Sequence, residues 1–207
     1  YECDEVKSHC SGISVFKVPK NIYKYPTLLI NSPLFYVGMP SSEDKKRTDM
    51  YKDNIERSKI YKQVIDREGT KNDWIKSLSL RLSINKISMS DKSISRIIQL
   101  FNRTNQFNLA SSKYNRFSFS NVLSKKDSFY YAASVSDRIG SEGLISVVGF
   151  TFANKKIIVT DYILSCRVFG RYIEESMLLT LFNFALARNS DIYFNLVDNG
   201  RNLVVKE

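Results

Sequence analysis

Residues 156–175 read KIIVTDYILSCRVFGRYIEE, and the fold depends on the change from a strand pattern to a helix pattern within this stretch. Residues 156–164 are rich in β-branched and aromatic side chains, which predicts a strand. Gly170 then interrupts the pattern, and a helix is expected over about residues 171–188. A strand that turns through a tight bend into a helix is typical of architectures that mix helices with a sheet.

Further regular elements are expected on both sides of this bend. Strand-like runs precede it at residues 129–135 and 144–152, and another follows at 191–197. Upstream, apolar residues recur at helical spacing and predict a helix that ends in the polar run 104–108, TNQFN; these residues are Ile94, Ile97, Ile98 and Phe101. The order of helix, three strands, helix and strand predicts an α/β (α+β) fold with a mixed sheet flanked by helices.

The chain before this core is less regular. Residues 12–18 alternate in hydrophobicity and predict a short strand, and all four prolines lie between residues 19 and 40. Ser41 opens a long, mostly charged helix that is expected to reach about residue 65. Residues 80–84 alternate as an edge or linker strand, and they follow a short helix capped by Asn72 and Asp73.

Composition limits the class of protein. With 43% hydrophobic residues, the 207-residue chain can bury one good core. No apolar run approaches the roughly 20 residues that cross a bilayer, and the acidic amino end lacks the order of a signal peptide, so we expect a cytoplasmic protein without membrane contact. The three cysteines form no CxxC pair, so neither a disulfide framework nor a metal site is expected.

The chain is basic, with 31 Lys and Arg against 21 Asp and Glu and a formal net charge of +10. A charge of this size favours anionic partners, although an ordinary solvated surface would give the same composition. The lysines are spread along the chain, and no nucleic-acid-binding signature occurs. We therefore expect no nucleic-acid partner, and a nucleic-acid binder is kept as a third hypothesis that rests on charge alone.

Chemistry-bearing residues gather near the bend. Cys166 follows the strand and precedes a helix amino end, where a thiolate nucleophile could accept an acyl group; simple packing of a small thiol is the alternative. Asp137, Glu142 and Glu174 are the candidate bases, and Glu174 could instead form an ion pair with Arg167 or Arg171. The single histidine, His9, lies in the other part of the chain, so a Cys-His-Asp hydrolase is not supported.

The polar run 104–108 is a candidate substrate-binding segment. Its hydroxyl and amide groups suit a polar acyl group or the amides of a pantetheine arm, and the residues that supply them are Thr104, Asn105, Gln106 and Asn108. Capping the helix and joining it to the next strand is the alternative.

Several segments together resemble one enzyme family. They are DEVK at residues 4–7, SSEDKKRTDMY at 41–51, WIKSL at 74–78, TNQFN at 104–108 and SCRVFGRYIEE at 165–175. They look like the carboxyl-terminal half of FkbH-like proteins, which join a phosphatase-type HAD domain to an acetyltransferase-like (GNAT-like) domain. The resemblance implies a HAD-like tail at 1–40, a helical linker at 41–90 and a GNAT-like domain at 91–207 that is incomplete at its carboxyl end.

The resemblance also implies a binding loop. In the family a strand leads into the pattern (Gln or Arg)-x-x-Gly-x-(Gly or Ala), whose backbone N–H groups hold the pyrophosphate of coenzyme A or the phosphate of phosphopantetheine. The matching positions are Arg167, Gly170 and Arg171, while Tyr172 departs from the expected small residue. The alternative is that Gly170 only makes a tight turn.

The family is similar to enzymes that take a glyceryl group from a phosphoglycerate-type donor and load it on an acyl carrier protein, in secondary-metabolite or polysaccharide biosynthesis. The chain has no Asp-x-Asp motif, so the magnesium-dependent phosphatase chemistry is expected only in the HAD part that it lacks. The resemblance therefore implies an acyltransferase that moves a glyceryl-type or other small hydroxyacyl group to a carrier thiol. A non-catalytic module that docks the carrier is the alternative.

Overall fold

The structure is a computed structural model that describes residues 2–10, 12–32, 34 and 42–205, with side chains from residue 48 onward in the longer segment. Tyr1, Pro33, Pro40 and Ser41, which entered the sequence predictions, lie outside the described residues. The chain divides into two compact units, Tyr1–Arg47 and Thr48–Glu207, and each is described by itself. The domain limits expected at residues 40 and 90 stay predictions.

The first unit contains short helices: α1 (Glu2–His9), the 3-10 helix η1 (Ile22–Lys24) and α2 (Tyr25–Ile30). Pro26 lies in the first turn of α2, where its missing N–H has no intrahelical partner to lose. The strand predicted at residues 12–18 is wrong, because these residues have no regular structure. Alternation alone does not make a strand when no neighbouring strand pairs with it, and none does among the described residues.

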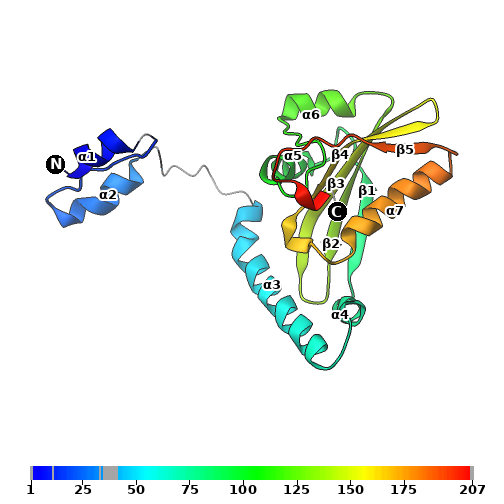
Figure 1. Ribbon diagram of the computed structural model, residues 1–207, viewed down its shortest axis with the longest axis horizontal. Coiled ribbons are helices and arrows are strands. Elements are labelled where there is room, and N and C mark those ends of the chain that lie inside the picture. The colour runs from blue at the N-terminus through cyan, green and yellow to red at the C-terminus, as the bar shows by residue number, and fades with distance from the viewer. Residues whose placement is uncertain (1, 11, 33, 35–41, 206–207) are drawn as a thin grey trace. The chain divides into compact units, whose positions relative to one another are not determined.

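The second unit is built on a mixed sheet, which the described residues form with five strands in the order β1-β2-β3-β4-β5. Neighbouring strands are antiparallel except β4 and β5, which are parallel. Their bounds are β1 (Arg81–Lys86), β2 (Ser128–Ser136), β3 (Ser141–Ala153), β4 (Lys156–Leu164) and β5 (Asp191–Phe194). The α+β fold class with a mixed, helix-flanked sheet is thereby confirmed (Figure 1).

Helices cover both faces of the sheet. On one face lies α7 (Ile173–Leu186), and on the other lie α5 (Ile94–Arg103) and α6 (Arg116–Leu123) (Figure 1). Alternate strand residues supply the two cores: Val148, Val159 and Tyr162 pack toward α7, while Val147 and Ile163 pack toward α5 and α6. The predicted helix over residues 94–103 and the strands around the bend are confirmed, because their periodicities match these buried faces.

Helix starts are set by local capping. The long helix α3 (Ser42–Asp66) is confirmed, but α4 (Lys71–Leu78) begins before the predicted cap. Its cap is Thr70, whose hydroxyl accepts from the Asp73 N–H at 3.3 Å while the Asp73 carboxylate accepts from the Thr70 N–H at 2.8 Å. The same reciprocal pattern, between Asn115 and Ser118, starts α6, a helix that was not predicted.

The strand expected at residues 80–84 is β1, and it is an edge of the sheet that pairs with β2 from Arg81↔Ser136 to Lys86↔Tyr131. At the other edge, β5 pairs with β4 only over residues 156–159. No helix within the described residues combines the length and the apolar character needed to cross a membrane.

Candidate active site at the strand–bend–helix element

The bend after β4 contains two residues in the left-handed backbone region. The chain leaves β4 through the 3-10 helix η3 (Cys166–Val168), and Gly170 and Tyr172 then have φ of 74° and 59°. Glycine adopts this region freely, whereas a bulky residue there is strained. Tyr172 therefore occupies a position whose backbone favours glycine, which is the residue type that the family pattern leads one to expect.

Unpaired backbone donors lie at the amino end of α7. Tyr172 is the N-cap residue and gives no side-chain cap, and no acceptor within the described part of the chain receives the N–H groups of Ile173 or Glu175. The Gly170 N–H is engaged, because it donates to Glu174 Oε1 at 3.1 Å. The first turn thus combines helix-end N–H donors with two carboxylates, Glu174 and Glu175, that already complement the helix dipole.

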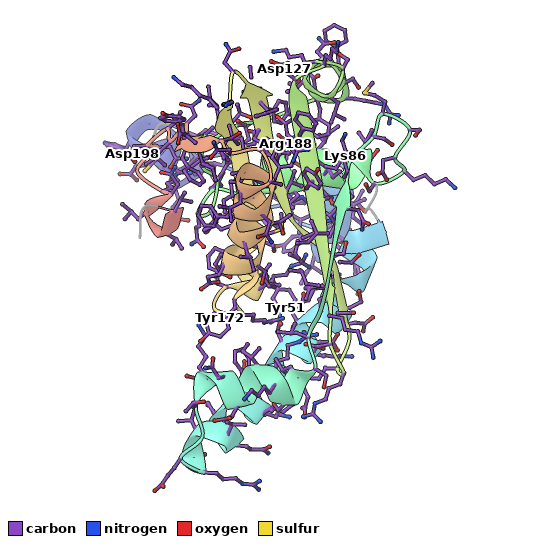
Figure 2. The ribbon with its side chains drawn as sticks, turned by 90° about the vertical axis from the view of Figure 1, so that its right-hand side faces the viewer. Tyr51, Lys86, Asp127, Tyr172, Arg188 and Asp198 are labelled. Atoms are coloured by element: carbon purple, nitrogen blue, oxygen red, sulfur yellow. The ribbon has the colours of Figure 1, made fainter. Side chains whose placement is uncertain are left out.

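An ammonium group that the sequence did not indicate lies beside the bend. Lys71 Nζ, from the first residue of α4, is 4.2 Å from the centroid of the Tyr172 ring. The same atom is 3.9 Å from the point where a Cβ on Gly170 would lie. Figure 2 shows Tyr172 at the end of α7 that is nearer to α4, with Arg188 just past the opposite end. A positive charge therefore lies beside the bend that leads into α7.

The arginines of the loop point elsewhere. Arg171 is buried, and its guanidinium donates to Glu142 Oε1 at 3.3 Å, to Asn54 Oδ1 at 2.9 Å and to the Arg167 carbonyl at 3.0 Å. Arg167 donates from Nε to Ser165 Oγ at 3.2 Å and extends toward Met50 of α3. Burial lowers the pKa of Arg171 below its ordinary value, and the charge of Glu142 opposes part of that shift. Arg171 is therefore held inside the protein, whereas the Arg167 side chain is 24% exposed.

These arginines belong to a buried ion cluster that joins α3 to one end of the sheet. At its centre Arg57, only 2% exposed, donates from Nε and Nη2 to the two carboxylate oxygens of Asp137 at 2.6 and 3.0 Å. Its Nη1 donates to Glu142 Oε1 at 2.7 Å and to Asn54 Oδ1 at 3.1 Å. Burial alone would lower the pKa of Arg57, but the hydrogen bond to Asp137 and the charge of Glu142 outweigh it and raise the pKa.

Asp137, a predicted base, is therefore fully engaged. Burial would raise its pKa, but the hydrogen bond from Arg57 and those from the N–H groups of Gly140 and Ile139 hold the pKa below 3.8. A carboxylate with a lowered pKa and a bidentate guanidinium partner is a weak proton acceptor. Its catalytic role stays a prediction, and its observed contacts join the β2–β3 turn to α3.

Cys166 lies where the sequence placed it, at the first position of η3, and its side chain is exposed. Among the described residues its thiol has no hydrogen-bond partner, and its carbonyl accepts from the Phe169 N–H at 3.4 Å. The packing alternative does not describe an exposed thiol, while the nucleophile hypothesis requires one that a substrate can reach.

The polar run after α5 fills part of the sheet edge. The Leu109 N–H donates to the Tyr162 carbonyl at 2.9 Å, and the Leu164 N–H donates to the Phe107 carbonyl at 3.1 Å. Asn108 forms an antiparallel bridge with Ile163. Residues 107–109 thus extend along β4 where β5 no longer pairs with it, so these backbone groups of β4 are not open to a ligand.

Three of the four predicted substrate-binding residues have structural contacts. Thr104 is the C-cap of α5, and Asn108 is 1% exposed and donates from Nδ2 to the Thr104 and Ser112 carbonyls at 3.3 and 3.2 Å. Asn105 Oδ1 accepts from Lys113 Nζ at 2.9 Å, and the same ammonium donates to three main-chain carbonyls at the end of α5. Gln106 is exposed. The run is in large part a helix stop joined to β4, and its role toward substrate stays a prediction.

The sequence did not lead us to predict that Asp161 is a buried acid. Asp161, 1% exposed, lies on β4 and accepts from the Tyr130 and Tyr114 hydroxyls at 2.5 and 2.9 Å. Burial, and to a smaller extent the charge of Asp161, raises the pKa of Tyr114 to about 12. The same two causes raise the pKa of Tyr130. The signal in the sequence was a lone charged residue, the aspartate, inside the strand-like run 157–164.

The structure brings the loop residues together, and the polar run lies beside the end of β4, where the Phe107 and Phe169 ring centroids are 6.0 Å apart. Cys166, Gly170 and Glu174 share the strand–bend–helix element, to which Lys71 is added. The described residues contain no group of three or more His, Cys, Asp or Glu side chains arranged to hold a metal ion. The amino end of α7 presents N–H donors, and donors of this kind suit an anion such as a phosphate.

Comparison with known proteins gives matches only among solved structures. No protein-family model matches the chain, and no curated protein matches it. The ribosomal-protein-alanine N-acetyltransferase from Brucella melitensis biovar Abortus 2308 is 14% identical over 57% of this chain and 82% of its own length, with a TM-score of 0.46.

Two further structures are similar at the same level. The ribosomal-protein-S18-alanine N-acetyltransferase from Escherichia coli is 7% identical over 55% of this chain and 66% of its own length, with a TM-score of 0.43. A predicted acetyltransferase from Clostridium acetobutylicum, solved with acetyl-CoA, is 18% identical over 61% of this chain and 87% of its own length, with a TM-score of 0.41. The chain thus spans just under two thirds of the Escherichia coli enzyme. At these identities and TM-scores, the activity of this chain has to be inferred from its own geometry.

Proposed function

We propose that this chain is an acyl-transfer domain that takes its acyl group from a pantetheine thioester. The observation that carries the proposal is the amino end of α7, where the N–H groups of Ile173 and Glu175 have no acceptor among the described residues and the Lys71 ammonium lies over the neighbouring Tyr172 ring. Such an end binds phosphate through its N–H donors and the positive end of the helix dipole. The phosphate of coenzyme A or of a carrier-bound phosphopantetheine is the group proposed to bind there, and phosphopantetheine fits the family resemblance.

Binding of this phosphate requires a local exchange of partners. Glu174 Oε1 accepts from the Gly170 N–H at 3.1 Å, which is one of the donors that the family pattern assigns to phosphate. The carboxylate has to leave that N–H before a phosphate oxygen can take its place, since like charges repel at this distance. Glu174 thus competes with the ligand, and its release would leave a carboxylate beside the bound arm, where it could act as the proposed base.

Cys166 is the proposed nucleophile. Its thiolate attacks the thioester carbonyl carbon, and the donor thiolate leaves with the electron pair of the broken C–S bond. In a second exchange of the same kind the carrier thiolate attacks the Cys166 thioester, and the acyl group passes to the carrier. The proton released when the Cys166 thiol ionises is taken by Glu174 and returned to the departing sulfur.

The finer assignment follows the family resemblance. The acyl group proposed is glyceryl-type or another small hydroxyacyl group, and the acceptor is an acyl carrier protein drawn by the basic charge of the chain. Gln106 and Asn105 are the residues of the polar run that are exposed enough to meet the acyl hydroxyls. Under the same proposal residues 1–40 end a phosphatase-type domain, and Mg²⁺ chemistry belongs to that domain.

The test combines adduct mass with transfer rate. Purified protein is incubated with an acyl-phosphopantetheinyl carrier, or separately with acyl-CoA, and the intact mass is measured before and after hydroxylamine treatment. We expect a hydroxylamine-sensitive adduct that Cys166→Ser abolishes. Lys71→Ala should raise the KM for the donor about tenfold with kcat little changed, because one charge-assisted hydrogen bond to the donor is lost. Lys76→Ala, an exposed lysine on the same helix, is the matched control.

Tyr172→Gly tests the bend itself. The change restores the residue type that the left-handed backbone favours and exposes the neighbouring N–H groups, so donor affinity should rise and the protein should still fold. Unchanged transfer in Cys166→Ser together with unchanged KM in Lys71→Ala would remove both the nucleophile and the phosphate site.

A non-catalytic carrier-docking module is the second candidate. The observation that favours it is the engagement of Arg167, Arg171 and Asp137 inside the ion cluster, which leaves the loop with few free functional groups. Under this alternative the carrier protein binds, and neither adduct nor transfer is observed with either donor. The intact-mass experiment with a parallel binding measurement separates the two candidates.

A further inference from the structure

Asp161 is a buried carboxylate held only by hydroxyl groups. Oδ2 accepts from Tyr130 at 2.5 Å, from Tyr114 at 2.9 Å and from Thr160 Oγ1 at 3.4 Å. A phenol-to-oxygen distance of 2.5 Å is typical of a hydrogen bond to an ionised acceptor. Within the described part of the chain no basic side chain forms an ion pair with Asp161. A buried negative charge without a cationic partner is costly, so a counter-charge is expected close by.

Two buried side-chain oxygen atoms, one of them on Asp161, lack hydrogen-bond donors among the described residues. Asp161 Oδ1 and Asn108 Oδ1 are both buried and without a partner among the described residues. The orientation of the Asn108 amide is fixed, because its Nδ2 donates to the Thr104 and Ser112 carbonyls. Exchanging its nitrogen and oxygen would break both hydrogen bonds, so Oδ1 is the acceptor atom. Both orphan atoms are acceptors, and a ligand between them has to be a donor or a cation.

The register of the sheet places the two residues on one face. Asn108 is opposite Ile163, and the neighbours of Asn108 on the chain, Phe107 and Leu109, pack on the α7 side. Asn108 and Asp161 therefore point to the α5–α6 side, as Ile163 does. Residues diagonal to each other across an antiparallel pair lie about 7–8 Å apart, a spacing that two oxygen-bearing side chains can bridge through one ion.

We propose that Asp161 and Asn108 are ligands of a buried monovalent-cation site, for Na⁺ or K⁺. One carboxylate and one amide oxygen are hard ligands, which suit such ions, and a single carboxylate neutralises a single charge. The Tyr114 and Thr160 hydroxyls adjoin the same carboxylate and could add ligands. The site lies on the opposite face of the sheet from α7, so the inference does not depend on the proposed acyl transfer.

The test is thermal unfolding in NaCl or KCl against choline chloride at one ionic strength and one chloride concentration. An ion that binds only the folded protein lowers the unfolding equilibrium constant about elevenfold at ten times its Kd. We therefore expect the unfolding temperature to rise saturably with Na⁺ or K⁺ and not with choline. Asp161→Asn keeps the shape and removes the charge, so it should abolish the rise, whereas Asp191→Asn, at an exposed position of β5, should keep it.

A second measurement covers the case in which Asp161→Asn fails to fold. The ²³Na resonance of a NaCl solution should broaden on addition of the native protein and sharpen again when KCl displaces the ion. Equal unfolding temperatures in all three salts would show that the two oxygen atoms bind only water and would overturn the proposal. If Na⁺ or K⁺ still raised the unfolding temperature of Asp161→Asn, the ion would bind at another place, and this result would also overturn the proposal.

Discussion

Replacing Arg57 by Met should destabilise the second unit strongly. The change deletes three hydrogen bonds shorter than 3.1 Å to Asp137 and Glu142 and leaves both carboxylates buried. Breaking a buried pair by removing one partner costs about 3–5 kcal/mol. Asp137 keeps the N–H groups of Ile139 and Gly140, and Glu142 keeps Arg171, so the lower end of that range, about 3 kcal/mol, is expected.

The assay is urea unfolding at pH 7, followed by circular dichroism and by the fluorescence of Trp74, the single tryptophan. With a slope of about 2 kcal/mol per molar urea, a loss of about 3 kcal/mol lowers the midpoint by about 1.5 M. Lys59→Met on the same helix removes an exposed pair with Glu56 at 3.4 Å and should cost under about 0.5 kcal/mol. A loss in Arg57→Met below about 1 kcal/mol, or equal to that in Lys59→Met, would refute the conclusion that this cluster joins α3 to the sheet.

Three further outcomes are expected. Gly149→Ala should cost about 1–3 kcal/mol in urea unfolding, because its Cβ would overlap the Tyr130 ring. The same change made in the Tyr130→Ala protein should cost much less relative to Tyr130→Ala alone, which checks the cause. The stabilisation by Asp137, whose pKa is lowered, is complete above pH 3.8 and is lost as the pH falls further, so Asp137→Asn should flatten the stability profile there. The pKa of Tyr114 is raised to about 12, so stability should fall as the pH rises from about 10 to 12, and Tyr114→Phe should reduce that fall.

Much of the fold was predictable because its elements have strong local patterns. The strands around the bend and the helix over residues 94–103 show hydrophobic periodicities that coincide with the faces buried against α7, or against α5 and α6. The helix α6 was missed although Asn115 and Ser118 carry a capping signal, since its short apolar pattern is weak. The wrong strand at residues 12–18 had the right alternation, but no strand in the described part of the chain pairs with it.

The candidate site was predictable only where its residues are close in sequence. Cys166, Gly170 and Glu174 fall within nine positions, and the structure keeps them on one strand–bend–helix element. Lys71 reaches the bend from a helix about 100 positions earlier, and no local pattern marks it. Arg57 was one basic residue among many on a charged helix, and nothing in its neighbourhood indicated burial.

The sequence by itself determined the strand–bend–helix element and the polar stop after residue 103, because backbone propensity, capping and periodicity act within a few residues. Only the tertiary structure decided which charged groups lose contact with water. Arg57 and Asp137 are 80 positions apart and share one buried ion pair, while Asp161 is buried against two tyrosines. Burial sets the free-energy cost of a charged group and therefore decides whether that group needs a partner. Burial in turn depends on how distant segments of the chain pack together.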